Sequence, residues 1–68
     1  MSVAKVVKLV AHSDKGIEDA VHAGLEEASK TLKGISGVEV ENFTCKVENN
    51  RIVDWKVTMH VAFEVEHT

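Results

Sequence analysis

The sequence predicts an α+β fold with the chain order β-α-β-β, in which a three-stranded, mostly antiparallel sheet curls around one helix. Every odd-numbered residue from Val53 to Val65 is apolar, and most of the even positions between them are polar. Seven matches to a period of two predict a long strand with one buried face. Between residues 17 and 32, apolar residues recur every three or four positions, which predicts an amphipathic helix. We expect a single domain over residues 1–68.

The last strand is too long for a lone protomer to cover. At about 3.3 Å per residue it measures roughly 40 Å. A globule of this chain length has a radius of gyration of about 11 Å and a width of about 22 Å. Such a small chain buries little surface, and its only cysteine, Cys45, cannot form an intrachain disulfide. We therefore expect a homo-oligomer whose copies cover the ends of the strand.

The composition excludes several classes of partner. The formal net charge of −3 is mild, and the lysines are interspersed with acidic residues. Nucleic-acid binding calls for a basic stripe, so no nucleic-acid partner is expected. No apolar run approaches the roughly 20 residues of a membrane span, and the N-terminal run carries lysines where a signal peptide would be apolar. We expect a soluble cytoplasmic domain with no membrane association.

The first strand and the helix have recognisable boundaries. The β-branched segment from Val3 to Val10 predicts the first strand, which should end where residues 11–14 begin. Ser13 or Asp14 is suited to cap the helix that follows. This helix should run for about 18 residues, from Ile17 to the neighbourhood of Gly34, where glycine can adopt the left-handed conformation. Its buried stripe is mostly alanine and glycine, and its solvent side carries Glu18, Asp19, His22, Glu26, Glu27 and Lys30.

The second strand, from Val38 to Glu48, changes its apolar parity midway. Val38 and Val40 are even-numbered, whereas the apolar residues from Phe43 onward are odd-numbered. A β-bulge near residues 41–42 resolves this conflict by inserting one extra residue. Residues 49–50, both asparagine, then predict a tight type I′ hairpin turn. Because the helix covers one face of the sheet, we expect the first strand to lie beside the third.

Several residues bear chemistry but permit more than one interpretation. On the polar face of the third strand, His60 lies near Lys56 and Glu64 in sequence, where the three line a ligand site or simply a solvated face. Cys45 is expected to be a small buried residue. Trp55 is expected in the core or an interface, with ligand stacking as the alternative. Three acidic residues could gather cations on one face of the sheet: Glu39, Glu41 and Glu48.

Catalytic and metal-binding patterns are not found in the sequence. No Ser-His-Asp set or paired carboxylates can be assigned, and no clustered Cys/His set has metal-ligand spacing. We therefore expect no enzymatic activity, no catalytic residue and no dedicated metal site.

Four segments together resemble the dodecin family. They are the opening strand at residues 5–13, the helix end at 28–32, the Val38-Glu39-Val40 step and the final strand at 55–65. The resemblance spans nearly the whole chain in order and spacing. It implies a β-α-β-β subunit whose sheet partly encloses the helix, and a hollow shell of twelve copies. Closed symmetric assembly would also account for the overlong strand.

The resemblance further implies a flavin pocket. Dodecins hold flavins in stacked pairs near threefold axes, between a tryptophan that opens the second strand and a glutamine in the third. These two positions align with Gly37 and Lys56 here, and Ser36, Asn42 and Thr44 fall at neighbouring pocket positions. Gly37 offers no ring to stack on, and stacking is worth about 1–3 kcal/mol per ring. Binding of FMN or riboflavin is therefore expected to be weak.

These observations favour one function and leave an alternative. The favoured function is a non-catalytic, dodecin-like shell that binds, stores or sequesters a small ligand, with a flavin as the ligand that the resemblance implies. The alternative is a dodecameric assembly that binds cations or is purely structural.

Overall fold

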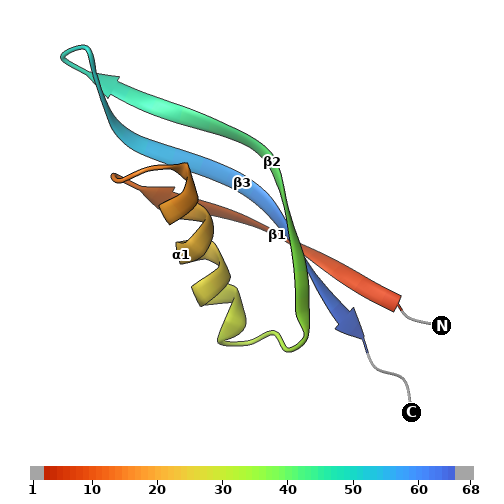
Figure 1. Ribbon diagram of the computed structural model, residues 1–68. Coiled ribbons are helices and arrows are strands. Elements are labelled where there is room, and N and C mark those ends of the chain that lie inside the picture. The colour runs from red at the N-terminus through yellow and green to blue at the C-terminus, as the bar shows by residue number, and fades with distance from the viewer. Residues whose placement is uncertain (1–2, 66–68) are drawn as a thin grey trace.

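The computed structural model describes residues 3–65 and contains one sheet and one helix (Figure 1). Strand β1 spans Val3–Ser13, helix α1 Ile17–Ser29, strand β2 Ile35–Glu48 and strand β3 Arg51–Val65. The sheet order is β1-β3-β2, and both pairs are antiparallel. This arrangement confirms the predicted β-α-β-β fold and the placement of the first strand beside the third.

The protomer is elongated. Its Cα radius of gyration is 14.1 Å and its principal extents are 55 × 20 × 13 Å, whereas a compact chain of this length would have a radius of about 11 Å. Figure 1 shows the reason: the β2–β3 hairpin extends past α1 at one end of the sheet, and β1 and β3 extend past it at the other. The helix therefore covers only the middle of the sheet.

The core lies where α1 crosses the middle of β3. Val57, Met59 and Val61 of β3 are completely buried, and Ala20 and Ala28 of α1 pack against them. The prediction that the odd-numbered residues of β3 are buried is thus confirmed for the centre of the strand. Toward the strand ends it is only partly covered: Trp55, Phe63 and Val65 are half-buried, and Val53 is exposed.

The helix differs from the sequence prediction at both ends. It has 13 residues instead of about 18, because the chain turns after Ser29, where the N–H groups of Thr31 and Leu32 both bond to the Ala28 carbonyl. The N-cap is Gly16, with no side-chain cap, so the prediction of Ser13 or Asp14 was wrong. The predicted solvent side of the helix is correct, since all six of its polar residues are exposed.

Ser13 has another role. Strand β1 continues through it, past the predicted end at Val10, because residues up to Ser13 keep their register with β3. The buried Ser13 hydroxyl accepts a hydrogen bond from the Lys15 backbone N–H at 2.9 Å and donates one to the Asp19 carboxylate at 2.7 Å. These two hydrogen bonds connect the β1–α1 turn to the first turn of the helix.

Three irregularities shape the sheet. The register between β2 and β3 shifts between Val40 and Asn42, which confirms the predicted bulge and makes Glu41 the extra residue. A second shift leaves Ser36 as an extra residue, and strand β2 begins at Ile35, three residues earlier than predicted. The third shift makes Val53 an extra residue of β3, and this interrupts the alternation near the hairpin.

The hairpin turn matches its prediction. Asn49 and Asn50 have positive φ angles of 53° and 62°, as the two central residues of a type I′ turn require. Within residues 3–65 no helix has the length and apolar character needed to cross a bilayer.

Candidate functional site

The polar side chains gather on the face of the sheet that α1 does not cover, which we call the open face. The buried odd-numbered residues of β3 point toward the helix, so the even-numbered residues from Asp54 to Glu64 point to the open face. Lys8 of β1 and Glu39 of β2 are the register partners of His60 on either side of β3. The open face is therefore built by all three strands.

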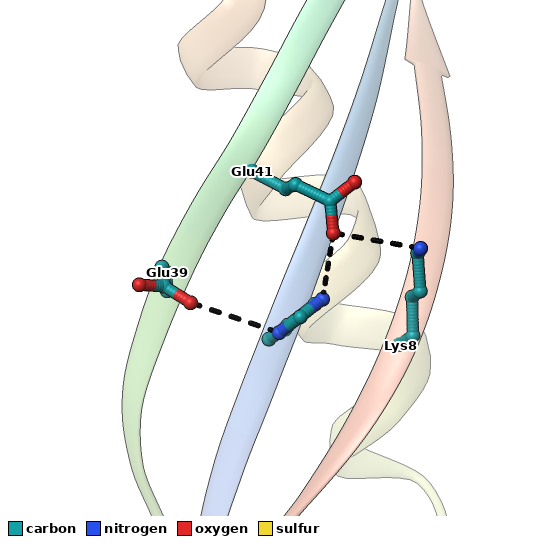
Figure 2. Close-up of polar contacts among 4 residues, drawn as sticks. Lys8, Glu39 and Glu41 are labelled. Carbon is teal, nitrogen blue, oxygen red and sulfur yellow. Dashed lines mark hydrogen bonds and ion pairs between the residues drawn. The ribbon is translucent and has the colours of Figure 1, made fainter.

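At its centre lies the His60 cluster, which consists of Lys8, Glu39, Glu41 and His60. His60 Nε2 lies 3.0 Å from Glu41 Oε1, and His60 Nδ1 lies 3.6 Å from Glu39 Oε1. Lys8 Nζ lies 3.4 Å from the same Glu41 oxygen. Figure 2 shows the Glu41 carboxylate over the middle strand, between Lys8 on one outer strand and Glu39 on the other, with the helix behind the sheet. The bulge at Glu41 places two carboxylates of β2 within reach of one imidazole.

The His60 cluster links the three strands but is only weakly shielded from water. The exposed fractions of the side chains are 59% for Lys8, 42% for Glu41 and 79% for Glu39. Ion pairs this exposed contribute little to stability, typically below about 1 kcal/mol each.

A second group lies on the open face near the hairpin and forms a cleft of about 230 Å³, which we call the His12 cleft. Lys56 of β3 is its central residue, with His12 of β1 and Thr44 of β2 as register partners on the two sides. His12 Nδ1 lies 2.8 Å from Asp54 Oδ2. The residues that line the His12 cleft are His12, Thr44, Cys45, Lys46, Asp54 and Lys56.

The structure separates the residues that the family resemblance assigned to a flavin pocket. Gly37 is opposite Ala62 on β3, whereas Thr44 is opposite Lys56. Ala62 and Lys56 are six residues apart on one strand, which corresponds to roughly 20 Å. The other two positions follow the same division: Ser36 is beside Gly37, and Asn42, opposite Thr58, is nearer the cleft. A single protomer therefore does not bring Gly37 and Lys56 together.

The surroundings of Gly37 are open. A Cβ atom built on Gly37 would have no heavy atom within 4 Å beyond its chain neighbours. The adjacent Ser36 hydroxyl donates a hydrogen bond to the Glu64 carboxylate at 3.2 Å. Glu64 therefore bonds to Ser36, and the sequence-based grouping of Glu64 with His60 and Lys56 is replaced by these separate contacts.

Trp55 and Cys45 lie on the helix-facing side. They are register partners, and both are half-buried. Trp55 alternates with Lys56 along β3, so its ring is on the opposite side of the sheet from the Lys56 side chain.

Two lining residues of the His12 cleft, His12 and Lys46, were not predicted as site residues from the sequence. The even parity of His12 would have placed it on the open face if the first strand had been extended to Ser13.

Electrostatic features elsewhere are modest. Within residues 3–65, no group of three or more His, Cys, Asp or Glu side chains is arranged to hold a metal ion. On the helix, a hydrogen bond from the Lys30 ammonium to the Glu27 carboxylate, together with Coulombic attraction, raises the pKa of Lys30 above its usual value. This pair is solvent-exposed, so it contributes little to the stability of the fold.

The protomer is an elongated β-α-β-β unit with a polar open face, and its site residues are divided between the two ends of that face. Comparison with known proteins identifies the family of this chain. The Dodecin family profile matches residues 3–66, and the chain belongs to the dodecin family. Dodecin from Thermus thermophilus is 33% identical over 66 residues, which cover 97% of this chain and 96% of the relative.

Solved structures agree with this assignment. The tt0972 protein from Thermus thermophilus superposes with a TM-score of 0.92 at 32% identity, covering 100% of both chains. Dodecin from Streptomyces davaonensis has a TM-score of 0.87 at 29% identity, with 97% of each chain covered. Dodecin from Streptomyces coelicolor has a TM-score of 0.88 at 25% identity, over 98% of this chain and 96% of that one.

Family membership supports a general class of activity. Dodecins are oligomeric proteins of a non-enzymatic, ligand-binding family, and dodecamer assembly is a family property. The fold and the family therefore support a small protein that acts by binding in an assembled state.

Proposed function

We propose that this chain forms a non-catalytic homododecameric shell that binds and stores or sequesters a small ligand at sites shared between copies. The observation that carries the proposal is the separation of Gly37 from Lys56 on one face of the sheet. Both positions belong to the pocket that the family resemblance implies, but they are roughly 20 Å apart along β3. A pocket that uses both therefore requires a second protomer.

The shape of the protomer supports assembly. Phe43, Val47 and Ile52 lie on the hairpin and are 50%, 59% and 47% exposed. On their side of the sheet the helix ends short of the hairpin, so another copy is the natural cover for these side chains (Figure 1). Closed symmetric assembly buries such surfaces without leaving a free end. Twelve copies of 7.5 kDa give an assembly of about 90 kDa.

The proposed ligand site is not an ordinary flavin clamp of the family. Gly37 contributes no ring, and Lys56 offers an ammonium group where an amide would read the edge of a ring. Loss of a stacking partner costs about 1–3 kcal/mol for each ring. We therefore propose that FMN and riboflavin bind weakly, and that the charge of Lys56 favours an anionic ligand.

Native mass spectrometry and flavin titration test the proposal together. The protein should appear as a dodecamer at micromolar concentration, and it should quench riboflavin fluorescence only weakly. A monomer or dimer would contradict the shell. A dodecamer that binds no small molecule from a metabolite mixture would instead favour the purely structural alternative, and elemental analysis of the same sample would reveal a bound cation.

Riboflavin quenching at nanomolar concentration would contradict the account of the pocket. In that case another aromatic side chain must reach the ligand. Phe43 and Trp55 are the candidates on the helix-facing side.

A further inference from the structure

The His12 cleft concentrates hydrogen-bond donors on one protomer. Lys56 lies in the middle strand, and within residues 3–65 its ammonium group makes no ion pair. Thr44, its neighbour on β2, contributes a hydroxyl group, whereas the imidazole of His12, its neighbour on β1, is bound to Asp54. Lys46 lines the same cleft and is 3.4 Å from Glu48, an exposed contact that a ligand can replace.

The one carboxylate that lines the cleft is already engaged. Asp54 Oδ2 accepts a hydrogen bond from His12 Nδ1, which fixes the orientation of the ring. The opposite ring nitrogen, Nε2, makes no hydrogen bond or ion pair within the part of the chain that the structure describes. The Lys56 ammonium group is therefore available to bind an anionic ligand.

We propose that the His12 cleft binds an oxyanion, either inorganic phosphate or the phosphate group of an ester. Lys56 is the principal charge partner, and Thr44 and Lys46 are additional donors. Ammonium groups bind phosphate as point charges, and such charge-assisted hydrogen bonds are about twice as strong as neutral ones. The cleft volume of about 230 Å³ accommodates a phosphate group and part of an organic substituent.

This inference deepens the proposed function by naming the class of ligand, but it does not depend on the shell. Gly37 takes no part in it, and every residue of the His12 cleft belongs to the same protomer. The oxyanion site can therefore exist in a single chain, whereas the shared flavin-type pocket cannot.

Equilibrium dialysis with radiolabelled phosphate tests the site on the full-length protein at constant, low ionic strength. Phosphate should bind saturably, and the substitution Lys56→Gln should weaken binding by about tenfold or more. Lys56→Arg, which keeps the positive charge, should restore most of the affinity. Lys33→Gln is the matched control, because it removes the same charge from an exposed residue in the α1–β2 connection, outside the cleft.

A second arm identifies the source of the phosphate group. Glycerol phosphate is compared with inorganic phosphate, and glycerol is the neutral control. Equal affinities assign the site to free phosphate, and tighter binding of glycerol phosphate assigns it to an ester. Binding of neither, or equal losses in Lys56→Gln and Lys33→Gln, would overturn the proposal.

Native mass spectrometry of the same samples keeps the two proposals apart. An intact dodecamer that binds no phosphate would overturn the oxyanion site alone. A monomer that binds phosphate through Lys56 would overturn the shell alone.

Discussion

Gly24 of α1 lies directly against Met59 of β3, so closely that a Cβ atom on residue 24 would overlap the terminal methyl group of Met59. Both residues are buried, and Met59 is completely enclosed in the core. The glycine lets the middle strand approach the helix where the core is densest. The buried side of α1 consists of alanine and glycine. These small side chains thus determine how closely the sheet can curl around the helix.

The substitution Gly24→Ala tests this contact. Alanine favours a helix over glycine by about 1 kcal/mol, but the added methyl group must displace a buried side chain, which costs about 1–3 kcal/mol. We expect a net loss of stability in chemical denaturation. Combining it with Met59→Val should recover part of the loss, which a double-mutant cycle would measure. An increase in stability from Gly24→Ala alone would show that Met59 moves aside freely.

Phe43 tests the role of the hairpin in assembly. It is 50% exposed in the protomer, so Phe43→Asp should leave the secondary structure of the chain nearly unchanged. If another copy covers it, the change should weaken association by about 2 kcal/mol or more, as expected for a buried aromatic anchor. Native mass spectrometry should then show smaller species. Ala23→Asp adds the same charge on the exposed side of α1 and should leave the assembly intact.

The hairpin turn offers a test of backbone strain. Asn50 has a φ angle of 62°, a conformation that glycine adopts without a steric cost. Asn50→Gly should preserve or raise the midpoint of thermal unfolding. Asn50→Ala should lower stability by about 1 kcal/mol, because most side chains disfavour this region. The reverse order of the two variants would contradict the type I′ assignment.

The double substitution Gly37→Trp with Lys56→Gln should create tight riboflavin binding. The space around Gly37 accepts a side chain without a local clash, and the new indole supplies the stacking surface that glycine lacks. Fluorescence quenching should strengthen by at least an order of magnitude over the unmodified protein. Lys56→Gln alone is the control and should not have this effect. Unchanged quenching in the double variant would mean that copies do not bring these two positions together.

The His60 cluster should matter little to stability. Its ion pairs are exposed, so His60→Gln should lower the free energy of unfolding by less than about 1 kcal/mol. Met59→Ala, one residue away on the buried face, should cost about 2–5 kcal/mol. Urea denaturation of both variants compares the two faces of β3 directly. Similar losses would contradict the assignment of His60 to a solvated face.

Much of the fold could be predicted because it depends on neighbours in sequence. The alternation along β3, the parity change around Glu41 and the paired asparagines are local patterns with direct structural consequences. The same holds for the solvent side of the helix. These features correctly predicted one bulge, the turn and the buried centre of β3, and the expectation that the helix covers one face of the sheet correctly predicted the strand order.

The site was predicted less completely because it depends on which residues meet across strands. The sequence pointed to His60, Lys56 and Glu64 as neighbours, but the contacts of His60 are with Glu39 and Glu41. The bulge at Glu41 decides this by bringing a second carboxylate of β2 to the ring. His12 entered the cleft because β1 continues to Ser13, a boundary that pairing with β3 maintains.

The sequence by itself determined the β-α-β-β order and the long third strand, because periodicity and turn chemistry suffice for these, and its chain length predicted association. Only the tertiary structure decided that the helix stops at Ser29, that Val53 breaks the alternation, and that Gly37 and Lys56 lie far apart. The physical reason is that each bulge shifts the register of the two paired strands, and these shifts add up along the pair. Distances across a sheet therefore follow from the whole pairing and not from any one motif.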